Sequence, residues 1–120
     1  MPVSEKPKYV EIKPRTRPEL EEALASDDAN TVCDALYSAA QHETDWHWTQ
    51  AKCLAMLSHE SLLVRSTAII ALGEIALFRG KLDRDLVLPE LKRLASDPAL
   101  GPFAEDVLAD LNSSHLDKPE

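Results

Sequence analysis

The chain has 120 residues, 44% of them hydrophobic but only 5% aromatic, and a formal net charge of −8 at pH 7. This length suits one domain, and the composition predicts a core built from Leu, Ala, Val and Ile. Three glycines and little alternation of β-branched residues argue against a sheet protein. No apolar run approaches the roughly 18 residues of a membrane span, and the N-terminal residues lack the apolar segment of a secretory signal. We therefore expect a cytoplasmic protein.

Charge is divided unevenly along the chain. Residues 1–18 contain five Lys or Arg, two Glu and four of the eight prolines, which predicts an extended or disordered N-terminal arm of charge +3. Because the whole chain carries −8, residues 19–120 carry −11. An acidic body repels nucleic acid and membrane surfaces and attracts a basic protein, although acidic residues can also serve solubility alone.

Polar residues and prolines divide the rest of the chain into six expected helices. They cover 19–25, 29–41, 44–57, 58–80, a segment that starts at 83 or 85, and 102–111. Together they form an all-α domain at 19–112, which a polar tail at 113–120 follows. In the fifth helix, the residues expected to face the core are Leu86, Val87, Leu91 and Leu94.

The stretch 58–80 is expected to form the central helix of the domain, and its apolar residues recur at steps of three and four. This helical stripe consists of Val64, Ala68, Ala71, Leu72 and Ile75. The flanks of the stripe are also apolar, and they consist of Ile69, Ile70, Ala76, Leu77 and Phe78. A helix that is apolar over most of its circumference is predicted to be buried, with neighbours on two or three sides. The residues left to meet water or a partner are Arg65, Ser66, Thr67, Glu74 and Arg79.

The pattern Val64-Arg65-x-x-Ala68-x-x-Ala71-Leu72-Gly73-x-Ile75 resembles the second helix of a HEAT repeat. This resemblance implies a short α-solenoid of about three helix pairs, a fold that serves mainly as a binding surface. The second helices of the pairs would begin near 29, 61 and 100, and the outer pairs, which lack the Val-Arg pattern, would act as caps. The resemblance also implies that Arg65 ties one repeat to the next through a carboxylate or a backbone carbonyl.

The residues that we expect to bind a partner lie mainly on the second helices, which line the inner face of a HEAT-type array. They are the carboxylates of Asp34, Glu74, Asp106 and Asp110, together with Tyr37. The alternative is an ordinary solvated face. Trp46 and Trp48 project about 200° apart on a helix, so we expect one in the core and the other at the surface. We take Trp48 as a candidate anchor for a partner.

Catalytic and metal-binding patterns are missing. His42-Glu43 begins like the zinc motif His-Glu-x-x-His, but Trp46 occupies the position of the second histidine. His59 and His115 do not complete a site, and the sequence holds no nucleophile elbow or phosphate-binding glycine loop. Cys33 and Cys53 lie in separate helical patterns, so we expect buried free thiols. We predict no enzyme, no metal and no cofactor.

Residues 19–112 as a whole resemble the small HEAT-like immunity proteins of bacterial contact-dependent growth inhibition and related polymorphic toxin systems. This resemblance implies a cognate protein partner, a basic toxin domain that is commonly a nuclease, and no contact with nucleic acid or membrane. Carboxylates would replace the phosphates that the toxin cleft holds, and so occlude the active site. Two alternatives stay open: a HEAT-repeat adaptor or scaffold that recognises a helix or peptide, and a HEAT-like enzyme subunit related to bilin lyases, which would carry a chromophore.

Overall fold

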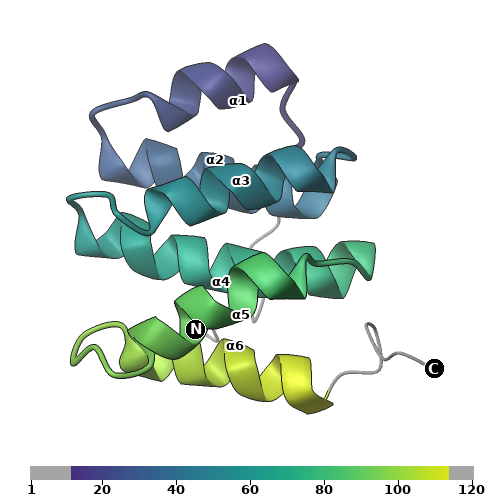
Figure 1. Ribbon diagram of the computed structural model, residues 1–120. Coiled ribbons are helices and arrows are strands. Elements are labelled where there is room, and N and C mark those ends of the chain that lie inside the picture. The colour runs from purple at the N-terminus through teal and green to yellow at the C-terminus, as the bar shows by residue number, and fades with distance from the viewer. Residues whose placement is uncertain (1–11, 114–120) are drawn as a thin grey trace, which may run out of the picture.

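The computed structural model describes residues 12–113, and this part of the chain consists of six α-helices and no strand (Figure 1). The helices are α1 (Arg17–Leu24), α2 (Ala29–His42), α3 (Trp46–Met56), α4 (Leu62–Arg79), α5 (Arg84–Leu94) and α6 (Gly101–Ser113). The all-α prediction is confirmed. Residues 1–11 of the expected arm and 114–120 of the expected tail lie outside the described residues. No described helix is long and apolar enough to cross a membrane.

Short polar side chains set the start of the first four helices. The Thr16 hydroxyl accepts a hydrogen bond from the Glu19 backbone, and the Glu19 carboxylate accepts one from the Thr16 backbone. This capping box starts α1 at Arg17, so the last two residues that we expected in the N-terminal arm belong to its first turn. The side chains that cap α2, α3 and α4 are those of Asp28, Asp45 and Ser61.

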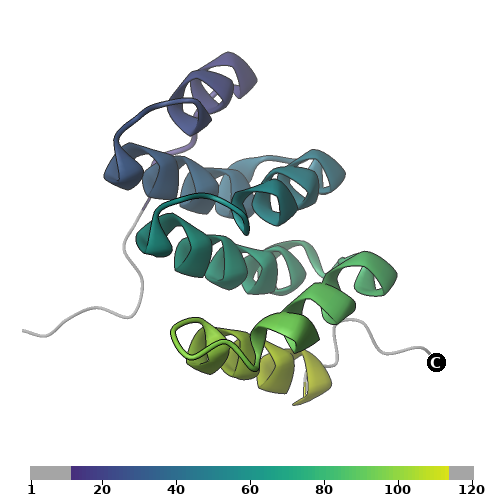
Figure 2. The same cartoon turned by 60° about the vertical axis from the view of Figure 1, so that its left-hand side comes forward.

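The helices pair along the chain and stack in two layers, as a short helical solenoid does. Helix α4 packs against α2 on one side and α6 on the other, and α3 and α5 lie over this row (Figure 2). Helix α1 covers the α2 end of the stack. The second helices of the three pairs are therefore neighbours, which is the arrangement expected from the sequence.

The central position of α4 explains why its sequence is apolar around most of its circumference. Its whole predicted stripe is buried without any exposed surface: Val64, Ala68, Ala71, Leu72 and Ile75. Each large aliphatic side chain that leaves water in this way contributes about 1.5–3 kcal/mol to folding. Contacts with α2, α3 and α6 come from different sides of the same helix, so α4 holds the domain together.

Four side chains of α4 differ from the prediction: two that we expected at the surface are buried, and two that we expected to be buried are exposed. Ser66 and Thr67 are buried. The Ser66 hydroxyl donates to the Leu63 carbonyl at 3.0 Å, and Thr67 is hydrogen-bonded with Tyr37 of α2. Leu77 and Phe78, which we placed on buried flanks, are 57% and 43% exposed. At this end of α4, the residues that pack into the core are the two that precede them, Ile75 and Ala76.

Two further predictions of burial are wrong. Leu86 does not face the core but is 54% exposed, while the adjacent Val87 is fully buried. Consecutive residues diverge by about 100° on a helix, so α5 presents only one of the two to the core. Trp46 and Trp48 are both half-buried against the core, so neither of the two expected environments exists.

Two glycines permit close approaches that the fold requires. A Cβ added to Gly73 would lie 3.3 Å from both methyl groups of Val107, so this glycine lets α4 and α6 pack closely. A Cβ on Gly101 would lie only 2.7 Å from the Ala95 carbonyl oxygen, in the turn between α5 and α6. Gly80 ends α4 in the left-handed conformation, with φ at 67°.

Candidate functional site

A groove of about 640 Å³ runs between α4 and α6, and we call it the α4–α6 groove. The residues that line it and that matter for its chemistry are Glu74, Leu77, Phe103, Asp106, Val107 and Asp110. Glu74, Asp106 and Asp110 were all predicted from the sequence as partner-binding residues. The structure brings these three carboxylates together, because Asp106 and Asp110 are four residues apart on α6 and so share one face.

Glu74 differs from the two α6 carboxylates in its surroundings. Asp106 and Asp110 are exposed, whereas Glu74 is half-buried, and its Oε1 atom is buried without a hydrogen-bond partner. Burial raises the pKa of Glu74, and a hydrogen bond with the Gln41 side chain lowers it only in part. The groove therefore contains a carboxylate that lacks a compensating positive charge and is costly to keep ionised.

Tyr37 lies on the α2 side of α4, half-buried and hydrogen-bonded to Thr67. Burial raises the pKa of its hydroxyl, the hydrogen bond from Thr67 opposes this, and the nearby charges of Glu74 and Asp34 raise it further. The Tyr37 hydroxyl is therefore close enough to Glu74 of α4 and Asp34 of α2 to feel the charges of both.

Asp34 is exposed on α2 but lines a different groove from the other three acids. This second groove, of about 780 Å³, lies between residues 12–15, α1 and α2. It mixes charges, because Lys13 and Arg15 line it together with Glu19, Glu22 and Asp34. Residues 12–13 lie against α2: the Ser38 hydroxyl donates to the Lys13 carbonyl at 2.8 Å, and His42 Nε2 is 2.6 Å from the Ile12 carbonyl.

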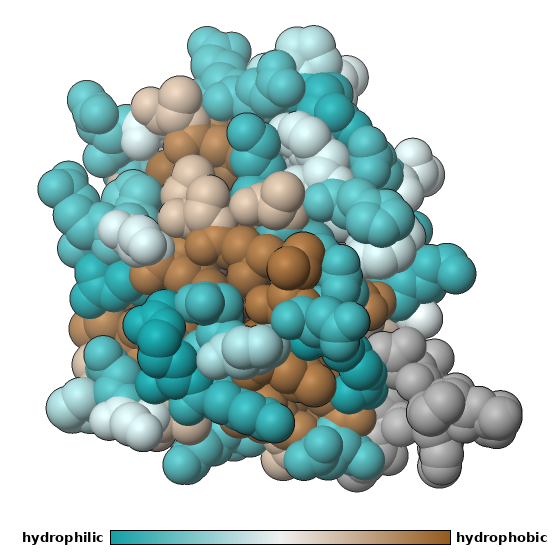
Figure 3. Space-filling model, in the orientation of Figure 1, coloured by the Kyte–Doolittle hydropathy of each residue, from teal (hydrophilic) through white to brown (hydrophobic). Residues whose placement is uncertain are grey.

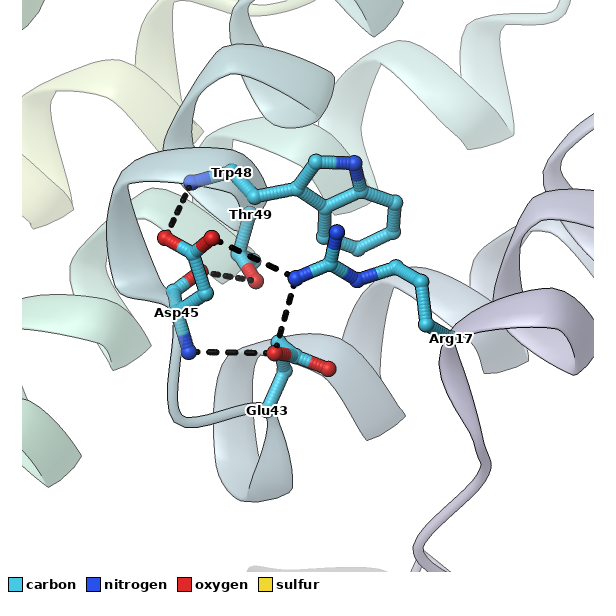
Figure 4. A network of polar contacts seen from close by, with 5 residues as sticks. All are labelled: Arg17, Glu43, Asp45, Trp48 and Thr49. Atoms are coloured by element: carbon cyan, nitrogen blue, oxygen red, sulfur yellow. Dashed lines mark hydrogen bonds and ion pairs between the residues drawn. The ribbon is translucent and has the colours of Figure 1, made fainter.

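A polar network around Arg17 was not predicted (Figure 4). Arg17 Nη2 of α1 donates to Glu43 Oε2 at 3.1 Å and to Asp45 Oδ2 at 3.3 Å, in the turn between α2 and α3. The Arg17 guanidinium also lies over the Trp48 ring, 4.1 Å from its centroid. The signal in the sequence was the acidic pair that precedes α3, but only the fold shows that an arginine 26 residues earlier meets it.

This network shifts the protonation of its members in favour of the charged forms. The pKa of Arg17 is raised, and the largest cause is its hydrogen bond to Glu43. At Glu43, burial favours the neutral acid, but the hydrogen bonds from Arg17 and the Asp45 backbone prevail and lower its pKa. Asp45 in turn caps α3 through the Trp48 backbone N–H, at 3.1 Å. The network therefore joins α1 to the start of α3.

Arg65 donates to two backbone carbonyls, those of His59 at 2.7 Å and Glu60 at 3.1 Å. Backbone carbonyls were one of the two kinds of acceptor implied by the HEAT resemblance. However, both lie in the turn just before α4, so these bonds fasten the turn within one helix pair.

Both cysteines are buried and free, and burial raises the pKa of Cys53 to about 12. Among residues 12–113, no three His, Cys, Asp or Glu side chains gather in a way that could hold a metal ion. His115 lies outside the described residues.

Apolar side chains reach the surface at several places. Figure 3 shows apolar surface across the middle of the face on which α3 and α5 lie toward the viewer. The most exposed of the large apolar residues are Leu77, Leu86, Leu63, Leu62, Phe78 and Phe103. Leu77 and Phe103 are the two that also line the α4–α6 groove.

The sequence matches no protein-family model and no curated protein. Among solved structures, the chain is similar to a chain in the crystal structure of a CDI complex from Cupriavidus taiwanensis LMG 19424. The two are 28% identical, the match covers 89% of this chain and 95% of that one, and the TM-score is 0.76. The all-helical architecture described above is thus shared over nearly the full length of a chain that was crystallised within a CDI complex.

Proposed function

We propose that this protein is an immunity protein of contact-dependent growth inhibition, which binds a cognate toxin domain and neutralises it. The observation that carries this proposal is the similarity to a chain of a CDI complex over 89% of the present chain. The role is one of binding rather than catalysis. It agrees with a short helical solenoid, because stacked helix pairs present a continuous surface to another protein.

The mechanism that we propose is stoichiometric occlusion of a basic cleft, which in a nuclease toxin would hold the phosphates of the substrate. Residues 19–120 carry a charge of −11, so the approach of a basic partner is favoured at long range. The α4–α6 groove offers three carboxylates beside exposed apolar side chains, a combination that can both attract and hold a partner. Asp34 and Tyr37 would extend this surface across α2.

The test begins with the tagged protein as bait in a lysate of its own organism, at low and at high salt. Capture of one basic protein with a toxin domain, in stoichiometric amount, is the expected result. The purified toxin domain should then lose its activity when one equivalent of this protein is added, and co-expression should restore growth of a host that produces the toxin. A captured toxin that stays fully active in the complex would overturn the occlusion mechanism.

Charge reversal tests the acidic surface directly. Replacing Asp34, Glu74, Asp106 and Asp110 with lysine should weaken toxin binding and flatten its dependence on salt. The matched control reverses four exposed acids outside both the α4–α6 groove and the predicted inner face: Glu21, Asp27, Glu60 and Glu105. Because both variants change the net charge equally, a difference between them reports the position of the charges. Equal effects would mean that only the overall charge matters.

The second candidate function is an adaptor that recognises a helix or peptide in the α4–α6 groove. It is favoured by the exposure of Leu77 and Phe103 in this groove. An apolar groove binder should be nearly indifferent to ionic strength, whereas binding by carboxylates weakens as salt is added. Retention of several unrelated proteins through high salt would therefore favour the adaptor over the immunity protein.

A further inference from the structure

Glu74 combines features that an ordinary surface carboxylate does not have. It lies on α4, which packs against α2, α3 and α6, and its Oε1 atom is buried without a hydrogen-bond partner. An ionised oxygen that is removed from water without a partner destabilises the fold. The one side-chain hydrogen bond given for the Glu74 carboxylate is with Gln41, and a glutamine at position 74 could also form it. Glutamine would occupy the same volume without the charge, so the folded domain by itself does not require the charge.

The surroundings of Glu74 are suited to a long side chain with a charged end. Leu77 is three residues further along α4, on the same side of the helix, and is 57% exposed. Phe103 lies across the groove on α6 and is 38% exposed. Arginine and lysine cover apolar surface with their aliphatic stems while the charged head contacts a carboxylate. The groove offers both kinds of contact.

We propose that the α4–α6 groove receives one arginine side chain of the toxin, with its guanidinium on Glu74 and its stem between Leu77 and Phe103. This proposal rests on the function proposed above and names the chemical group that the site recognises. Arginine is favoured over lysine because a guanidinium is more weakly hydrated than an ammonium. Its five donors can also bind Glu74 and an α6 carboxylate at the same time.

The two kinds of carboxylate then have different roles. Asp106 and Asp110 are exposed at the rim of the groove, so they accelerate association and make it sensitive to salt. Glu74 pairs with the arginine away from water, so it governs dissociation and is screened much less. Raised pKa of the free Glu74 carboxyl agrees with this role, because the partner would supply the missing positive charge.

The decisive variant is Glu74→Gln, measured by surface plasmon resonance with the purified toxin domain. It should weaken affinity by roughly 30-fold or more, chiefly through faster dissociation, and leave the salt dependence almost unchanged. The double variant Asp106→Asn and Asp110→Asn should mainly slow association and flatten the salt dependence. Glu105→Gln, an exposed change on α6 away from the groove, is the control and should have no effect.

Stability separates a lost contact from a damaged fold. Because Glu74→Gln removes a half-buried charge that no cation balances, this variant should unfold at a higher temperature than the natural protein at pH 7. Weaker binding by a more stable protein assigns the loss to the missing contact. Unchanged affinity, or a loss confined to association, would overturn the proposal while leaving toxin binding itself intact.

A small-molecule probe tests the groove without the toxin. N-acetyl-arginine methylamide, at tens of millimolar, should shift the backbone NMR signals of α4 and α6 around Glu74, and the neutral citrulline analogue should not. The shifts should disappear in Glu74→Gln. If the arginine probe binds but no toxin is captured, the proposed function fails and the recognition chemistry survives. If the toxin binds normally but the probe and variant show nothing, only the arginine site fails.

Discussion

The Arg17 guanidinium lies over the Trp48 indole ring, 4.1 Å from its centroid, and the same guanidinium binds Glu43 and Asp45. Arg17 starts α1 and Trp48 is in the first turn of α3, so the contact joins two helices that do not follow one another. Planar, delocalised charge allows arginine to stack on an aromatic ring and to pair with carboxylates at once. The first helix pair is thereby fixed to the second.

We predict that Arg17→Gln lowers the melting temperature and uncovers the Trp48 ring. Circular dichroism measures the first effect, and quenching of tryptophan fluorescence by acrylamide measures the second. The control is Arg93→Gln, which removes an exposed ion pair with Glu90 and should leave both quantities nearly unchanged. Equal melting temperatures for the two variants would contradict a structural role of the network.

Trp48 stays a predicted binding anchor. Trp48→Ala should lower the free energy of unfolding by about 2 kcal/mol, because the ring is half-buried against the core. Trp48→Phe keeps much of this packing, so an affinity for the toxin that falls about tenfold in this variant would report a contact with the partner. Affinity equal to that of the natural protein would leave Trp48 with a structural role only.

Glu43 should make the fold sensitive to acid. In the folded state its pKa is lowered from 4.5. As the pH is lowered through about 4.5, the unfolded chain therefore takes up more protons than the folded protein, and the free energy of unfolding decreases. Glu43→Gln should be less stable than the natural protein at pH 7 and should lose less stability between pH 5 and pH 3. Urea unfolding across this range measures both, and a parallel loss in the two proteins would exclude Glu43 as a source.

Glu74 should act in the opposite direction. Because its folded-state pKa is raised above 4.5, the natural protein carries a penalty at neutral pH that disappears as both states become protonated in acid. Glu74→Gln should therefore be the more stable protein at pH 7 but should lose this advantage toward pH 4. The same urea titrations provide the measurement, and an advantage that persists in acid would show that the carboxylate charge is not the cause.

The two thiols should be almost unreactive in the folded protein. Cys53 has no exposed surface and a pKa of about 12, and burial also raises the pKa of Cys33, which is 6% exposed. Only the thiolate reacts with iodoacetamide, so mass spectrometry after treatment at pH 8 should find both residues largely unmodified. In 6 M guanidinium chloride both should react within minutes. Rapid reaction of Cys53 in native buffer would contradict its burial.

Replacement of Gly101 should lower the free energy of unfolding more than replacement of Gly80. A Cβ there would contact the Ala95 carbonyl oxygen at 2.7 Å, so Gly101→Ala must displace backbone and should lower stability by about 2 kcal/mol or more. Gly80→Ala places a side chain in the left-handed conformation without a clash and should cost about 1 kcal/mol. Urea unfolding ranks the two, and the reverse order would show that the α5–α6 turn can relax.

Helix positions could be predicted because their causes are local. Asp28, Asp45 and Ser61 cap helices through hydrogen bonds to residues three positions away, and Gly80 ends α4 by its own backbone conformation. The apolar stripe of α4 likewise depends only on the helical period, so its burial could be predicted without knowing which helices pack against α4. Leu86, Leu77 and Phe78 were misplaced because an apolar residue at the edge of a stripe is buried only if another helix covers it.

The class of fold, the order of the helices and the positions of acidic residues on the second helices could be predicted without a structure, since they follow from composition and short-range periodicity. Which of these acids lie together became known from the packing of the helices. It brings Glu74 to Asp106 and Asp110 and places Asp34 in another groove, because the packing of α4 on α6, which Gly73 permits, is a contact between distant parts of the chain. The meeting of Arg17 with Glu43 depends on packing in the same way: no pattern in a single sequence encodes the distance between residues on different helices.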